Sequence, residues 1–177
     1  MRQYISVEAD GYAENVMDSE KLNAKIDFLG KFRNLNFVEQ IVLTDSAMQS
    51  QIDMPNMILK GGAQYAQNEA RGGAELRLSS GEMVFSGDWN GNRESYEADL
   101  ALDSFPVISI LPLSELKEIT ANAKVKGVGY DPFNPKTTID ASLRIDKLSY
   151  GNKIYRDVEA VASVADQNAK VELKSKN

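Results

Sequence analysis

The sequence predicts an all-β protein: a mostly antiparallel, curved sheet forming an open groove, with one short helix. Apolar and polar residues alternate along most of the 177-residue chain, and a period of two belongs to strands rather than helices. Clusters of Gly, Asn, Asp and Pro separate the alternating runs, as turns do. Hydrophobic residues make up 42% of the chain, which is too much for a disordered segment.

The N-terminal third alternates only weakly. Strands are expected at five segments: 4–9, 24–28, 37–44, 50–59 and 63–67. Gly30 is expected to end the second strand, and Pro55 to confine the fourth to an edge or a break. Gly61 and Gly62 are expected to separate the last two strands.

The alternation sharpens from residue 74 onward. It predicts three strands: 74–78, 83–89 and 96–102. The residues at 79–81 form the expected turn between the first two. Asn90 and Gly91 predict a type I′ hairpin turn, because that turn needs positive φ at both central residues.

A single stretch favours a helix. The apolar run 106–111 does not alternate, and Pro112 suits a first helical turn. Leu113, Leu116 and Ile119 follow at helical spacing. A helix over 112–117 is therefore expected.

The second half of the chain predicts a regular hairpin. Alternating strands are expected at 119–129 and 139–146, separated by 131–135. Pro132 and Pro135 fix two backbone angles there, so we interpret this segment as a rigid turn rather than a recognition loop.

Further strands are expected toward the C-terminus. A turn through Gly151 and Asn152 leads to a strand at 158–164. A turn at 166–168 then leads to a last strand at 169–173.

Composition excludes several function classes. The net charge of −6 argues against nucleic-acid binding, which favours a basic face. The chain has no histidine and no cysteine, which excludes a serine–histidine hydrolase and a thiol nucleophile. Its carboxylates alternate with lysine and arginine on the polar side of strands, which is typical of a solvated surface rather than a glycosidase pair. No apolar run reaches the ~20 residues of a membrane span.

One short motif has a faint likeness to a calcium loop. Asp88, Asn90, Asn92 and Glu94 place side-chain oxygens at alternate positions, but the twelve-residue pattern is incomplete. We interpret this segment as a polar hairpin turn. Neither a metal nor a cofactor is expected.

The apolar side of the predicted strands carries the functional hypothesis. A sheet that meets no second sheet must cover its apolar face by curling, by helices or by a ligand, and one short helix cannot cover about ten strands of ~17–20 Å. The candidates for a lipid groove are Leu76, Leu78, Phe85, Leu100, Leu102, Ala121, Ala123, Val125, Ile139, Ala141, Leu143 and Ile145. Small residues among them either leave volume for a ligand or lie opposite large ones such as Phe105, and both alternatives stay open. Phe85 and Trp89 are either a ligand platform or ordinary inward residues of the sheet.

Several segments resemble the TamB-like proteins of the AsmA superfamily. They are 96–102 (YEADLAL), the aspartate, serine and proline within 103–106, the residues Leu111, Pro112, Leu113 and Leu116, then 127–133 (GVGYDPF) and 143–150 (LRIDKLSY). The resemblance is clearest over 74–177 and implies that 1–177 is one segment of a longer repetitive protein. It implies a β-taco, a sheet curled into a gutter with an apolar interior, and it brings no catalytic motif.

The resemblance also implies a place and a role. The expected location is the periplasm, with the full-length protein anchored in the inner membrane. The expected function is non-enzymatic: a groove that conducts lipid between the inner and outer membranes. The alternative is a scaffold or chaperone surface for outer-membrane protein assembly, which would capture β-strands at an open edge. A third hypothesis, from another class, is a polysaccharide-processing β domain.

The expected partners follow from these hypotheses. They are lipid acyl chains and outer-membrane assembly proteins, with no nucleic acid. An exposed edge strand also predicts an edge-to-edge homodimer of this segment.

Overall fold

The computed structural model describes residues 4–18, 20–33, 56–110 and 115–175. The strand expected at 37–44 and most of the strand expected at 50–59 lie outside these residues. The first half of the expected helix, 112–114, lies outside them as well.

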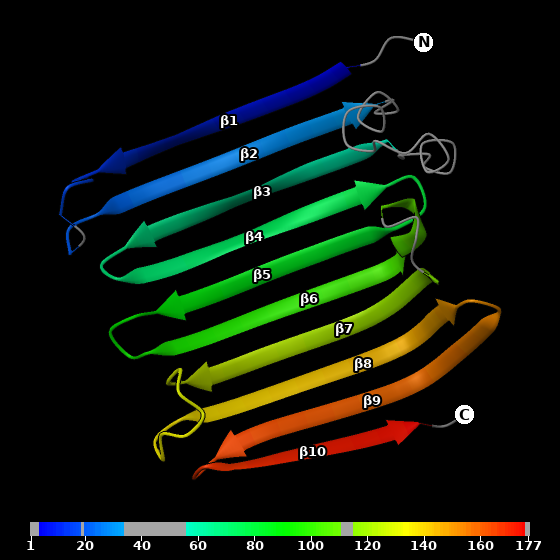
Figure 1. Ribbon diagram of the computed structural model, residues 1–177. Helices are drawn as coiled ribbons and strands as arrows, with labels where there is room; N and C mark the ends of the chain where they lie inside the picture. The colour runs from blue at the N-terminus through cyan, green and yellow to red at the C-terminus, as the bar shows by residue number, and fades with distance from the viewer. Residues whose placement is uncertain (1–3, 19, 34–55, 111–114, 176–177) are drawn as a thin grey trace, which may run out of the picture.

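Within the described residues, ten strands form one antiparallel sheet, and each strand lies beside its neighbours in sequence (Figure 1). The predicted all-β antiparallel fold is confirmed. The strands are β1 (Tyr4–Glu14), β2 (Asn23–Arg33), β3 (Met57–Ala66), β4 (Glu69–Leu78), β5 (Glu82–Asn90), β6 (Ser95–Phe105), β7 (Leu116–Val128), β8 (Thr138–Tyr150), β9 (Lys153–Ala165) and β10 (Asn168–Ser175).

The helix expected over 112–117 is wrong where the structure describes it. Leu116 and Lys117 begin β7, and the described residues contain no helix beyond one short 3₁₀ turn, η1 (Val107–Ser109). Leu116 lies opposite Tyr150 of β8, so sheet pairing overrides the helical spacing of three leucine and isoleucine residues.

Three glycines expected to interrupt strands lie inside them. Gly30 sits within β2, and Gly61 and Gly62 sit within β3. A Cβ at Gly61 would lie 2.7 Å from the Phe28 ring, and one at Gly30 would lie 2.7 Å from the Phe32 ring. Gly30 and Gly61 therefore make room for neighbouring aromatic rings, a Cβ at Gly62 would lie 2.5 Å from the Asp27 carboxylate, and none of the three breaks its strand.

Two tight turns have the backbone that hairpins require. Gln67 and Asn68 join β3 to β4 with φ of 53° and 63°, and Asp166 and Gln167 join β9 to β10 with φ of 50° and 62°. Positive φ at both central residues is the signature of type I′ turns. The type I′ turn expected at Asn90 and Gly91 is wrong, because β5 ends at Asn90, four residues follow, and neither of the two has positive φ.

The pairing register divides the sheet into an apolar and a polar face. Four rows of directly paired residues cross all ten strands on the apolar face, from Val7, Ala9, Gly11 and Ala13 on β1 to Ser175, Leu173, Val171 and Ala169 on β10. Every position in these rows except Ser175 is apolar, aromatic or glycine. We call this surface the apolar face.

Ion pairs cover the opposite, polar face. Lys60 pairs with Glu75 across β3 and β4, and Lys124 of β7 pairs with Glu97 of β6. Hydrogen bonding to Glu97 raises the pKa of Lys124, which keeps its charge in place. The face is a solvated one, as the sequence predicted.

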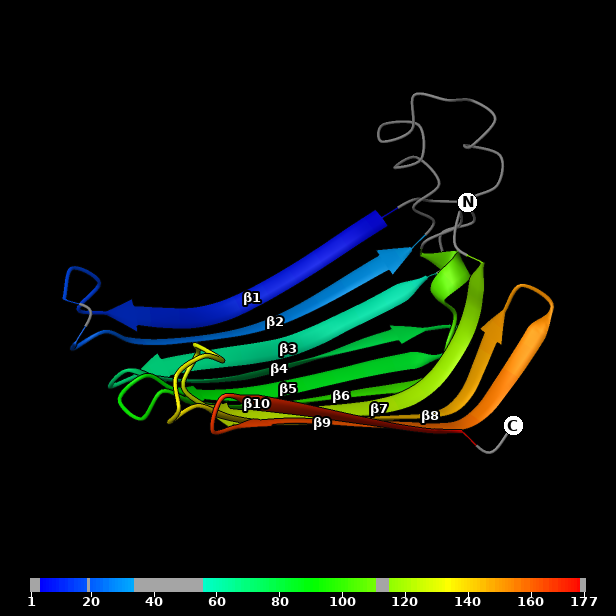
Figure 2. The same ribbon diagram turned by 60° about the horizontal axis from the view of Figure 1, so that its bottom comes forward.

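The sheet is open and does not curl into a gutter. The four rows run straight across the strands from β1 to β10, so neighbouring strands are hardly displaced along their own direction. A sheet that closes on itself needs such a displacement, or stagger, to add up from strand to strand. Register shifts occur between Leu102 and Phe105 and around Thr120, near one end of the strands. At that end β7, β8 and β9 bend toward η1 (Figure 2), as bulged strands do.

Almost no apolar side chain is buried. Among the described residues only Phe105, 8% exposed, and Ala121, 2% exposed, form a hydrophobic core. The accessible surface is 12200 Å², whereas a compact monomer of 19.6 kDa exposes ~8600 Å². The sheet therefore presents its apolar face without a covering layer among the described residues.

Candidate functional site

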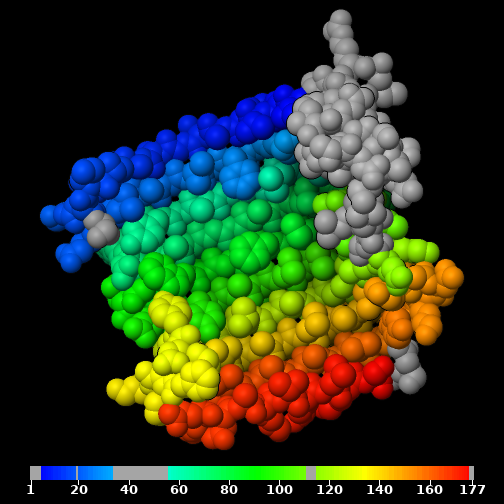
Figure 3. All heavy atoms as spheres, in the orientation of Figure 1, coloured from blue at the N-terminus to red at the C-terminus, as the bar shows by residue number. Residues whose placement is uncertain are grey.

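The apolar face has a hollow over its N-terminal half. The cavity measures about 1050 Å³ and extends over β1 to β6. One row supplies its floor with small side chains: Ala63, Gly72, Gly87 and Ala98. Figure 3 shows this face toward the viewer, with the loop between β7 and β8 (yellow) rising at one end.

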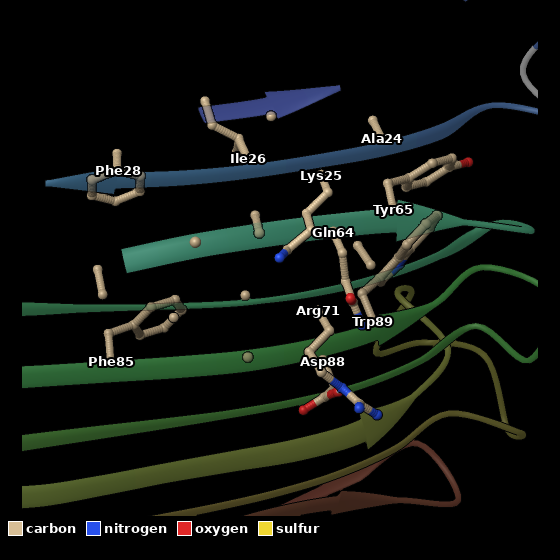
Figure 4. Close-up of a pocket in the computed structure, with 18 of the residues that line it drawn as sticks. Ala24, Lys25, Ile26, Phe28, Gln64, Tyr65, Arg71, Phe85, Asp88 and Trp89 are labelled. Carbon is tan, nitrogen blue, oxygen red and sulfur yellow. The ribbon is translucent and has the colours of Figure 1, made fainter. Parts of the chain in front are cut away.

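Aromatic side chains wall the hollow on both sides. Phe28 and Phe85 belong to the row on one side of the floor, and Tyr65, Trp89 and Tyr96 belong to the row on the other. Figure 4 shows the Phe85 ring apart from the Tyr65 and Trp89 rings, which lie together. Because large residues flank a row of small ones, the floor becomes a trough that crosses the strands.

The second wall is a connected aromatic cluster. Tyr65 stacks on Trp89 with ring centroids 6.4 Å apart, and Tyr96 stacks on Tyr130 at 6.0 Å. The Trp89 indole Nε1 donates a hydrogen bond to the Tyr130 hydroxyl at 2.5 Å. The rings offer apolar bodies to the trough and polar tips at the strand ends, as amphipathic aromatics do.

The loop that carries Tyr130 is held in place by its backbone. Gly129 adopts φ of 79°, and its N–H donates to the Glu94 carbonyl at 2.8 Å. Thr137, at the other end of this loop, is buried. The Asp131 carboxylate accepts from the Phe133 N–H at 2.9 Å, which is a turn within the loop. The segment expected to be a rigid turn is thus a turn that also positions an aromatic wall residue.

The polar groups behind the trough are paired with one another. Arg71 and Asp88 form an ion pair at 2.5 Å, and this hydrogen bond raises the pKa of Arg71. Asn90 donates to Glu69 at 2.5 Å, and Asn92 donates to the Gln67 carbonyl at 3.0 Å. The residues with a faint likeness to a calcium loop therefore bond across hairpins. No group of three or more acidic residues in the described part of the chain is placed to hold a metal.

Comparison with protein-family models, curated proteins and solved structures found no match to this chain. The resemblance to TamB-like proteins therefore stays a prediction, and the site is argued from its own geometry. Within the described residues, no helix has the length and apolar content to cross a membrane.

The structure places all twelve groove candidates on the apolar face, in the rows that cross the sheet and their extension at Leu78. Of these, Phe85 lines the trough. The others extend the face from β4 to β8. Ala121 is buried beneath the η1 end, whereas Ala123 and Ala141 are half-buried. Ala121 thus lies in a filled core, whereas Ala123 and Ala141 leave space on the open face.

Sequence reasoning missed most of the trough. Phe28, Ala63, Tyr65 and Gly72 lie in the segment that showed only weak alternation. The trough could have been found from the alignment of small residues in neighbouring strands. That alignment requires the pairing register of the strands. Tyr130 was missed because it lies in a loop.

Proposed function

We propose that the apolar face binds lipid acyl chains and that the protein is a non-enzymatic segment of a lipid conduit between the inner and outer membranes. One observation carries the binding proposal: four rows of apolar residues, hollowed by a trough of about 1050 Å³, lie uncovered among the described residues except near η1. The two membranes and the periplasmic location rest on the resemblance to TamB-like proteins.

The dimensions of the trough suit an acyl chain. Neighbouring strands lie ~4.8 Å apart, so the floor of small residues from β3 to β6 is ~14 Å long. One leaflet of a bilayer contributes about half of the ~30 Å hydrocarbon core, which is the length of one chain. Each CH₂ group transferred from water to such a surface contributes ~0.8 kcal/mol. An acyl chain lying across the strands would therefore extend along the floor of the trough, between the two aromatic walls.

The aromatic cluster favours a lipid over a purely apolar ligand. Trp and Tyr side chains concentrate where hydrocarbon meets polar groups, because one part of each ring system is apolar and another can hydrogen-bond. Trp89 lies next to the last residue of β5, Tyr130 follows the end of β7, and their polar tips are hydrogen-bonded to each other. This is where the polar end of a lipid would emerge.

The first experiment extracts gently purified protein and identifies bound lipid by mass spectrometry. The second measures uptake of a fluorescent fatty acid by wild type and by the double variant Ala63→Leu and Ala98→Leu, which fills the floor. Ala101→Leu, on the polar face of the same strand as Ala98, is the matched control. We expect the double variant to lose uptake and keep its melting temperature, and the control to resemble wild type. A wild type without bound lipid and without uptake would refute the proposal.

The scaffold hypothesis is a second candidate because, among the described residues, β1 and β10 each pair with one strand only. An extended peptide with the alternation of an outer-membrane strand could add to such an edge. Binding of that peptide in the absence of fatty-acid uptake would favour this candidate over the conduit.

A further inference from the structure

The two edge strands are unprotected on the apolar side. Among the described residues β1 pairs only with β2, and β10 pairs only with β9. Neither edge contains proline, and neither pairing has a bulge. Their apolar sides carry no charge, and Val7, Val171 and Leu173 are 63%, 73% and 71% exposed. Proteins that must stay monomeric normally block such edges with these devices.

The polar sides of the two edges carry different charges. β1 presents Glu8, Asp10 and Glu14, and no salt bridge joins Glu8 or Asp10 to another described residue. β10 presents Lys170 and Lys174, with Glu172 between them. Glu172 lies 2.6 Å from Lys170 and 3.8 Å from Lys174, so it balances one of the two lysine charges and a net charge of +1 remains. One edge is therefore acidic and the other is basic.

This asymmetry selects among the ways in which two copies can meet. Two β1 edges would bring together polar sides whose only charged residues are carboxylates, and two β10 edges would bring together polar sides that both carry net positive charge. Like charges directly opposite each other destabilise a strand pair, whereas opposite charges stabilise it. Contact between unlike edges is the arrangement that the charges favour.

We propose that β10 of one copy pairs antiparallel with β1 of a second copy, so that the sheet continues from one molecule into the next. One register places opposite charges together on the polar side and apolar residues together on the apolar side. It sets Lys170 opposite Glu14 and Lys174 opposite Asp10 on the polar side. On the apolar side it sets Leu173 opposite Gly11, so a large residue meets a glycine, and the apolar face continues unbroken across the junction.

The symmetry of this contact determines the form of the assembly. The two partners use different surfaces, so each added copy leaves one free β1 and one free β10. The result is a concentration-dependent series of oligomers rather than a closed dimer. This differs from the simple edge-to-edge homodimer that the sequence suggested.

Sedimentation velocity over a range of protein concentrations tests the proposal. All samples contain a mild detergent, so that the apolar face is covered and association through it is suppressed. Wild type is compared with Lys170→Glu and Lys174→Glu together, and with Asp10→Lys and Glu14→Lys together. Lys117→Glu with Lys136→Glu is the control for net charge, because both lysines lie away from the two edges.

We expect a series of oligomers for wild type and for the control, and association weakened by about tenfold or more in each edge variant. An equimolar mixture of the two edge variants should associate again, because acidic β10 then meets basic β1. Wild-type association should also fall as salt is raised. A monomeric wild type, or edge variants that associate as wild type does, would overturn the proposal. Neither result bears on fatty-acid uptake, which is measured separately.

Discussion

Two alanines on one strand show how the packing changes within a few ångströms. Ala121 and Ala123 lie on β7 and point to the same face, yet Ala121 is 2% exposed and Ala123 is half-buried. Ala121 lies at the end where Phe105 is buried and η1 folds over the sheet (Figure 2). The same residue type therefore belongs to a packed core at one position and to an open surface two residues later.

This difference predicts opposite responses to a larger side chain. Ala121→Leu should destabilise the protein by about 1–3 kcal/mol, because added methylenes in a packed site force strain. Ala123→Leu should leave stability unchanged within about 0.5 kcal/mol. Urea unfolding of both variants measures the difference. If the two variants have the same unfolding midpoint, the two positions have the same environment and the packed end is misassigned.

A pair of neighbours on β8 tests the assignment of the faces. Leu143 lies on the apolar face with 38% exposure, and Ser142 lies on the polar face. Full burial of a leucine contributes about 1.5–3 kcal/mol, so Leu143→Asp should cost about 1–2 kcal/mol at this partly exposed position. Ser142→Asp should change stability by less than about 0.5 kcal/mol. Equal thermal shifts for the two variants would mean that the register of β8 is wrong.

Strands of this sheet differ in how firmly they are held. Every residue of β10 is exposed, and it pairs on one side only among the described residues. β7 and β8 each have 13 residues, pair on both sides and border the small buried core. Amide hydrogen exchange should therefore be fastest in β10 and slowest in β7 and β8, since local opening follows burial. Uniform protection across the sheet would argue that it opens only as one unit.

Some elements could be predicted from the sequence and others could not. Residues 119–129 and 139–146 of the β7 and β8 hairpin alternate without interruption, so this part of the two strands and the proline-containing turn were predicted. The prediction divided β3 into two strands at Gly61 and Gly62. A glycine that makes room for the Phe28 ring and a glycine in a turn cannot be told apart in the sequence. The start of β7 was predicted as a helix because Leu113, Leu116 and Ile119 share helical spacing, and only the partner strand decides between the two.

The candidate site was predicted as a face but not as a shape. Alternation alone indicated that Leu76, Phe85, Leu100 and Leu143 share one side of a sheet. The trough depends on which residue lies beside which across several strands, and a single sequence does not contain the register. The sheet's failure to curl has the same origin, because stagger is a property of the pairs.

The whole molecule has a larger accessible surface than a compact monomer of its size, and large apolar side chains such as Val7, Val171 and Leu173 contribute to it. A ligand that covers the apolar face should raise the melting temperature, because binding to the folded state alone adds RT ln(1 + [L]/Kd). Adding fatty acid at about 100 times its Kd should stabilise wild type by ~2.7 kcal/mol. The Ala63→Leu and Ala98→Leu double variant should gain much less. Equal thermal shifts for the two proteins would show that the ligand binds away from the trough.

Because the same four rows continue from strand to strand, each added strand widens the sheet by the same amount. Each hairpin presents the same four apolar rows as its neighbours, so adding or removing one hairpin changes the width of the face by ~10 Å and leaves its cross-section unchanged. Length can therefore vary through duplication or loss of hairpins without any compensating change elsewhere. In a chain of this kind, the number of strands alone sets the width of the apolar face.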